Sequence, residues 1–201
     1  MPLSTLEREI ASAVAERRAA LLDDLRLHVE MPTGGNNALA LDASRRMLLE
    51  RLASLGASTT IVPGDAKPDW LLGASGGPIP PTGIASRPSR EAGLTRILIA
   101  GHLDTVHDPA GPFLKLSPSA DGKTAIGPGC VDMKGGIVIA VAALEVLHEL
   151  GVDVSWSFLL NSDEETGSYH SERAIRDAAR AHDLALALEP ALPDGSLVVE
   201  R

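Results

Sequence analysis

The sequence predicts an α/β fold, with a three-layer α/β/α arrangement around a largely parallel mixed sheet. Short apolar runs alternate with longer helical patterns along most of the 201 residues, as is typical of a sheet with helices on both faces. One run, RILIA at 96–100, is continuously apolar, like a strand that is covered on both faces. A hydrophobic content of 44% is enough to build such a core.

Two helices are expected at the start of the chain. Leucines recur at helical spacing over residues 4–29, where Ser4 or Thr5 can cap the first turn. A second helical pattern covers residues 37–55 and is followed by Gly56, a residue that suits the end of a helix.

A region of short strands and loops follows these helices. The β-branched segment ASTTIVP at 57–63 predicts a short strand. Residues 73–94 are rich in Gly, Pro and Ser, and a structureless loop of that length is unusual inside a domain. We therefore expect a loop with a short edge strand near 83–87, which would pair with RILIA.

The second half of the chain continues the alternation. Residues 133–150 are apolar on nearly all sides and predict a buried helix. The other expected elements are a strand at 154–161, a helix at 171–183, a strand at 184–190, a turn at 193–195 and a strand at 196–200.

The composition limits the partners and the compartment. A formal net charge of −9 disfavours nucleic acid and anionic membranes, because both bind clustered cations. The single cysteine, Cys130, cannot form an internal disulfide or a multi-cysteine zinc site. The first residues show no apolar signal core, and the longest apolar run, at 137–144, is too short to span a bilayer. We therefore expect a cytoplasmic protein.

Three of the predicted strands, all expected to be buried, end in side chains that can bind a metal ion. His102 follows RILIA, the acidic pair at 164–165 follows VSWSFLLN, and Glu189 follows LALAL. Because ligands of such sheets bind beyond the carboxyl ends of the strands, we expect these side chains to lie at one edge. Asp132 comes directly before the predicted buried helix and would join them.

The residue types indicate metal-assisted hydrolysis of an amide. Histidine and carboxylate ligands suit zinc, and also cobalt or manganese. The period of two along a strand places His102 and Asp104 on one side, so Asp104 could fix the imidazole tautomer. Glu164 and Glu165 are adjacent and point in different directions. One could bind metal while the other takes a proton from the attacking water.

Each of these features also has a plainer explanation. His102 and Asp104 could form a polar turn, and an acidic pair is often a solvated loop or the start of a helix. Asp132 could cap the following helix, and Glu189 could lie at an exposed strand end. The coincidence of all four favours the metal site, but the pattern alone leaves both explanations open. His107 is expected to line the wall of the cleft without binding metal.

Four motifs together resemble a known family. GHLDTV, GPGCVDMKGG, NSDEETGS and LALEP lie between residues 97 and 190, in the order and spacing of the co-catalytic zinc amidohydrolases and peptidases. That family includes glutamate carboxypeptidase, acetylornithine deacetylase, succinyl-diaminopimelate desuccinylase and aminoacylase. The motifs look closest to the glutamate carboxypeptidase branch.

The resemblance implies a zinc-peptidase-like fold and a role for each motif residue. Two zinc ions per complete active site are implied, with Asp132 bridging them. Glu164 would be the general base and then the proton donor to the leaving amine, and Asp104 would orient His102. The peptide bond between Asp132 and Met133 would be cis. The implied metal ligands are His102, Asp132, Glu165 and Glu189.

The resemblance also implies a domain organisation, because family members are much longer. Residues 1–201 would form the N-terminal segment of the catalytic domain, incomplete at the C-terminus. A lid domain, through which the full-length form would be a homodimer, and a C-terminal catalytic segment with a last zinc-binding histidine would be absent. The substrate would be an N-acyl amino acid or a small peptide. The alternative is a non-catalytic metal-binding or interaction module of the same fold, which would have no need of Glu164.

Overall fold

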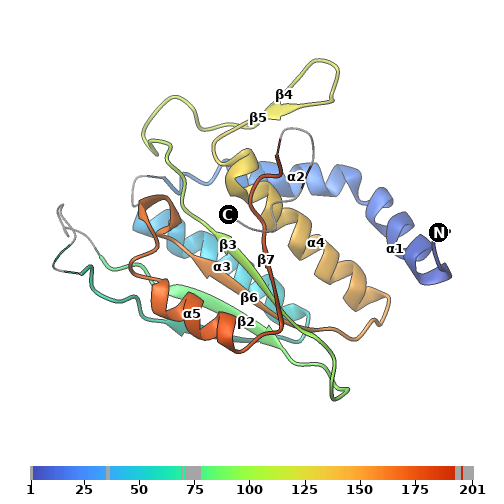
Figure 1. Ribbon diagram of the computed structural model, residues 1–201. Helices are drawn as coiled ribbons and strands as arrows, with labels where there is room; N and C mark the ends of the chain where they lie inside the picture. Colours follow the sequence, from blue (N-terminus) through green and yellow to red (C-terminus); the bar gives the residue numbers. More distant parts are fainter. Residues whose placement is uncertain (1, 35–36, 69, 71–77, 193–195, 197–201) are drawn as a thin grey trace.

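The computed structural model describes residues 2–34, 37–68, 70, 78–192 and 196. Five strands form one mixed sheet in the order β1-β2-β6-β3-β7 (Figure 1). Strands β6, β3 and β7 are parallel to one another, and β1 and β2 join them in antiparallel pairs. The strands are β1 Ser58–Val62, β2 Thr82–Arg87, β3 Arg96–His102, β6 Ser155–Asn161 and β7 Leu184–Ala187.

Helices cover both faces of this sheet, which confirms the predicted three-layer α/β/α fold. Helices α3 and α4 share a core with the face that carries Ile99 and Phe158. Helix α5 packs on the opposite face, against Leu98 and Leu159, and α1 and α2 contact α4 (Figure 1). The helices are α1 Thr5–Glu16, α2 Arg18–Val29, α3 Ala38–Ser54, α4 Gly135–Glu149 and α5 Glu172–Arg180.

The sequence alternates between the two faces as a strand period of two requires. In β6, Phe158 is fully buried on the α3 and α4 side, while its neighbour Leu159 is buried under α5. In β3, Ile99 and Leu98 divide in the same way. RILIA is therefore covered on both faces, as predicted. Burial of each large apolar side chain contributes about 1.5–3 kcal/mol to the stability of the sheet.

The prediction of a single helix over residues 4–29 is wrong, because the structure has two helices that meet at Arg17. At Arg17 the backbone has ψ 2°, and its N–H donates to the carbonyl of Val14, one residue short of the helical partner. The Arg17 guanidinium forms an ion pair with Glu149 at the end of α4. No Gly or Pro marks this break, so the sequence pattern runs through it.

Two strands are placed differently from the prediction. The expected edge strand near 83–87 is β2, which lies inside the sheet between β1 and β6 and does not pair with RILIA. Both edges of β3 are already filled by β6 and β7, so β2 finds its partner in β6. Strand β7, expected to be buried, lies at the edge of the described sheet, with Leu184 48% exposed.

The remaining described elements are short. A two-stranded hairpin joins β4 Ser117–Pro118 to β5 Ala125–Ile126. A turn, Cys130–Lys134, with non-helical backbone at Asp132 and Met133, leads into α4. No helix in the described ranges is long and apolar enough to span a bilayer. The turn predicted at 193–195 lies outside the described residues, and so does most of the strand predicted at 196–200.

The sheet brings three strand ends together at one edge. In register, His102 at the end of β3 is opposite Asn161 at the end of β6. On the other side, Ala100 of β3 is opposite Ala187, the last residue of β7. The residues that follow β6 and β7 therefore begin beside His102, as parallel strands require.

Candidate metal centre

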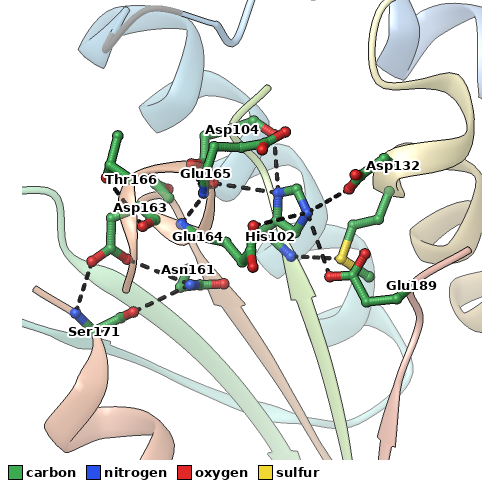
Figure 2. Close-up of polar contacts among 12 residues, drawn as sticks. His102, Asp104, Asp132, Asn161, Asp163, Glu164, Glu165, Thr166, Ser171 and Glu189 are labelled. Atoms are coloured by element: carbon green, nitrogen blue, oxygen red, sulfur yellow. Dashed lines mark hydrogen bonds and ion pairs between the residues drawn. The ribbon is translucent and has the colours of Figure 1, made fainter. Parts of the chain in front are cut away.

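His102 lies at the centre of the cluster and is 1% exposed. Its Nε2 atom is 2.9 Å from Asp132 Oδ1 and 3.6 Å from Glu189 Oε1 (Figure 2). Its Nδ1 atom is 3.0 Å from the backbone carbonyl oxygen of Asp104. A carbonyl only accepts, so Nδ1 carries the proton and donates it. The ring thus directs Nε2 towards the carboxylates, the orientation that a metal ligand needs.

The cluster favours positive charge at this point. Burial lowers the pKa of His102, but Asp104, Glu189 and Asp132 outweigh this effect and raise the pKa to about 9. Burial raises the pKa of Glu165, and the nearby carboxylate of Asp132 raises it further. The pKa of Glu189 is raised for the same two reasons. A divalent cation bound among these carboxylates would reduce the repulsion between their negative charges.

Asp132 is positioned by the turn that precedes α4. The peptide bond between Asp132 and Met133 is cis, as the resemblance predicted. Just before the turn, Gly129 has φ 64°, and a Cβ there would lie 2.6 Å from Thr105 Cγ2. Glycine therefore meets both a backbone and a space requirement at this position. Behind Asp132, the buried Met133 accepts the backbone N–H of His102 at its sulfur, with 3.1 Å between N and Sδ.

Glycine also lets α4 approach the strand end that carries Glu189. A Cβ on Gly136 would lie 2.1 Å from the carbonyl oxygen of Leu188. Any larger residue would therefore push the first turn of α4 away from the segment after β7. The second glycine of the MKGG motif thus allows Asp132 and Glu189 to approach the same imidazole nitrogen, His102 Nε2.

One carboxylate connects His102 to the acidic pair. Asp104 is 7% exposed, and its Oδ1 lies 3.4 Å from His102 Nδ1. Its two oxygens accept the backbone N–H groups of Glu164, at 3.3 Å, and Glu165, at 3.0 Å. The sequence predicted only the contact with His102. The structure shows that Asp104 also holds the backbone of both glutamates, which its sequence position could not reveal.

A second buried carboxylate, Asp163, shapes the loop of the acidic pair. It is 3% exposed and accepts the backbone N–H groups of His170, at 2.7 Å, and Ser171, at 3.1 Å. Its own carbonyl accepts the N–H of Ser168 at 2.7 Å. Together these bonds close the turn NSDEETGS on itself. In the sequence, Asp163 is recognisable only as part of this motif. The signal that could have identified it is an acid just beyond Asn161, where a buried strand ends.

Arg45 supports the same loop from α3. It is 3% exposed, and one guanidinium nitrogen donates to Ser162 Oγ at 2.8 Å, while another pairs with Asp42. In the sequence it is one charged residue within a helical pattern and resembles an exposed one. Only the packing of α3 against the end of β6 distinguishes it.

The structure brings the four predicted ligands together. Donor atoms of His102, Asp132 and Glu165 all lie within 4.8 Å of one another, and Glu189 Oε1 lies 3.6 Å from His102 Nε2 (Figure 2). One imidazole nitrogen with three carboxylates is a donor set that zinc, cobalt or manganese accepts. Glu164 stands next to this group, with Oε2 3.9 Å from His102 Nε2 and its side chain 47% exposed.

A cavity of about 260 Å³ opens beside these ligands and is lined in part by Asp132 and Glu165. His107 forms part of its wall, and the ring packs edge-on against Phe113 with centroids 5.0 Å apart. A group bound in this cavity would be adjacent to two of the candidate ligands.

Comparison with known proteins gives an independent view of the same residues. Residues 98–200 match the model of Peptidase family M20/M25/M40. The chain is 29% identical over 186 residues to carboxypeptidase G2 from Pseudomonas sp. strain RS-16, and the match covers 89% of this chain and 40% of that protein. It is 37% identical over 107 residues to succinyl-diaminopimelate desuccinylase from Erythrobacter litoralis strain HTCC2594, covering 49% of this chain and 27% of that one.

Solved structures share the fold. Human carnosine dipeptidase 1 aligns with a TM-score of 0.74 at 19% identity, over 90% of this chain and 40% of that chain. The Saccharomyces cerevisiae dipeptidase Dug1p aligns with a TM-score of 0.73 at 16% identity, with the same coverage. The chain therefore spans less than half the length of the relatives that it matches here.

Proposed function

The chain belongs to Peptidase family M20/M25/M40, and from this we propose that it is the metal-binding part of an enzyme that hydrolyses an amide bond. The substrate would be an N-acyl amino acid or a small peptide, as for a carboxypeptidase or deacylase. One observation carries the proposal: the buried His102 directs Nε2 towards Asp132 and Glu189, and its other nitrogen is held by Asp104. Such an arrangement is how proteins orient a metal-binding imidazole.

Zinc is the proposed metal, with two ions in a complete site. His102, Asp132, Glu165 and Glu189 would hold it, since their donor atoms converge and no other group of three or more such side chains is found in the described ranges. When bound, the metal would polarise the scissile carbonyl and lower the pKa of the attacking water.

Glu164 is proposed as the general base. It is not in the three-ligand group, its side chain is half exposed, and Oε2 lies 3.9 Å from His102 Nε2. A free carboxylate in this place could accept the proton of the attacking water at Oε2 and later donate it to the leaving nitrogen. Asp104 holds the backbone from which this side chain extends, because it accepts the N–H of Glu164.

A matched pair of variants tests these roles. Glu164→Gln should keep its zinc and lose at least about 100-fold in turnover, the lower end for losing a positioned acid–base group. Glu165→Gln should lose zinc as well as rate. Zinc content and the hydrolysis of N-acyl amino acids with added zinc are measured on both. Near-normal turnover in Glu164→Gln would contradict the assignment of the general base, whereas zinc binding without turnover in the wild type would favour a metal-binding or interaction module. The same assay on any longer form of the protein separates a missing segment from a missing activity.

A further inference from the structure

The cavity beside the candidate ligands has an apolar wall. Asp132 and Glu165 line one part of it, and Val106, Ile126 and Val131 line another. A molecule that fills this space therefore contacts two candidate metal ligands and several aliphatic side chains at once. Under the proposed function, a group bound here would be the part of the substrate next to the bond that is cleaved.

The three aliphatic side chains are largely exposed to water. Val106 is 73% exposed, Ile126 67% and Val131 64%. Single exposed apolar residues are common on proteins and need no explanation. These three, however, come from separate segments: the loop after β3, the β5 strand and the turn before α4. Their convergence on one cavity is typical of a binding surface.

In the described part of the chain, the cavity lining lacks the cationic side chains that usually bind an anionic group. Among the described residues that line it, none is Lys or Arg, and its two carboxylates, Asp132 and Glu165, are candidate metal ligands. Proteins bind carboxylates mostly through Arg or Lys. Lys123 and Lys134 are near the lining residues in sequence, and neither is part of the lining. Lys134 is buried and donates to the carbonyl of Met31 at 2.8 Å.

We propose that this cavity binds an apolar substituent of the substrate, either an aliphatic acyl group or an aliphatic amino-acid side chain. The proposal rests on the proposed function and adds a substrate class to it. It also separates this chain from a relative named for a succinyl group, because succinyl ends in a carboxylate. Each added methylene that enters the cavity should improve binding about fourfold, as expected for burial of one CH₂.

The test uses two pairs of substrates with matched shapes. The first pair is N-(4-methylpentanoyl)-alanine and N-succinyl-alanine, and the second is N-acetyl-leucine and N-acetyl-aspartate. Binding to the zinc-loaded chain is followed through the NMR methyl signals of Val106, Ile126 and Val131, and hydrolysis is measured in parallel. All four substrates carry an α-carboxylate, so the members of a pair differ in the charge of the substituent. We expect at least a tenfold preference for the member whose substituent is uncharged, called the uncharged member, in at least one pair, with shifts at these methyls.

Two substitutions with the same chemical change provide the control. Ile126→Lys places a cation in the cavity wall and should reduce or reverse the preference by at least tenfold. Ile139→Lys makes the same change at a residue that is also 67% exposed but lies on α4, outside the cavity lining. It should leave the preference unchanged.

The outcomes separate the two proposals. Methyl shifts with the uncharged ligands but no hydrolysis would keep the cavity assignment and count against the proposed function. Hydrolysis with no preference in either pair, or with the charged member preferred in both, would overturn the cavity assignment alone. It would also be overturned by the absence of shifts at the three methyls, or by equal effects of the two lysine substitutions.

Discussion

Asp104→Asn should weaken both the fold and the metal site, although it changes only one atom of the side chain. One carboxylate oxygen of Asp104 accepts the N–H of Glu165 at 3.0 Å, and the other accepts the N–H of Glu164 at 3.3 Å. Asparagine keeps a single acceptor, and its NH₂ group would face a backbone N–H that also donates. The site is 7% exposed, so water cannot easily replace the lost bond.

The size of the effect follows from these contacts. Losing one buried hydrogen bond to a charged acceptor costs about 1.5–3 kcal/mol. The substitution also removes a negative charge 3.4 Å from His102 Nδ1, and loss of such a partner typically lowers metal affinity by about 10–100-fold. We therefore expect a drop of about 2–3 kcal/mol in the free energy of unfolding, together with weaker zinc binding.

Urea titration of the metal-free chain and calorimetric titration with zinc measure the two effects separately. Asp108→Asn is the matched control, because Asp108 is exposed in the same loop and accepts the N–H of Ala110 at 2.9 Å. That variant should stay within about 0.5 kcal/mol of the wild type, as is usual for surface substitutions. If Asp104→Asn behaved like the control in both titrations, Asp104 would not join the imidazole to the acidic pair.

Three further predictions concern the framework of the site. Asp163→Ala removes a buried acceptor of two backbone N–H groups and should lower the free energy of unfolding by about 3 kcal/mol in urea; a loss below about 1 kcal/mol would contradict this role. Gly136→Ala places a methyl group 2.1 Å from the Leu188 carbonyl oxygen and should weaken zinc binding. Gly151→Ala is the control: no atom lies within 4 Å of its added methyl group, but its φ of +69° is unfavourable for alanine. This control should lower the stability and leave zinc binding unchanged. Burial lowers the pKa of His28 from 6.5, so the unfolded chain takes up a proton first as the pH falls. His28 therefore does not change the free energy of unfolding above about pH 6.5, and it lowers this free energy as the pH falls below that value. His28→Gln should make the free energy of unfolding less dependent on pH below about pH 6.5.

The sequence could predict the layers of the fold and the place of the site because both depend on strong local patterns. An apolar run buried on both faces predicts an inner strand, and RILIA is one. Once β3 and β6 are parallel neighbours, the residues after them must meet at one edge. The positions of His102 and of the acidic pair follow from that rule alone.

The errors in the sequence prediction come from contacts between distant segments. The break at Arg17 coincides with an ion pair to Glu149, 132 residues away, and nothing in the local sequence marks it. The place of β2 depended on which strands already occupied the two edges of β3. Asp104, Asp163 and Arg45 act through backbone groups and hydroxyls brought near by folding, so their residue types alone could not identify these roles.

Calorimetric titration of the metal-free 201-residue chain with zinc at neutral pH is the most direct test of the central claim. The described residues place one imidazole, His102, within reach of the carboxylates, and two carboxylates with water make a weak zinc site. The account predicts one tight zinc per chain, lost in His102→Ala and retained in Glu164→Gln. No binding by the wild type, equal binding by His102→Ala, or two tight and equivalent sites per chain would contradict it.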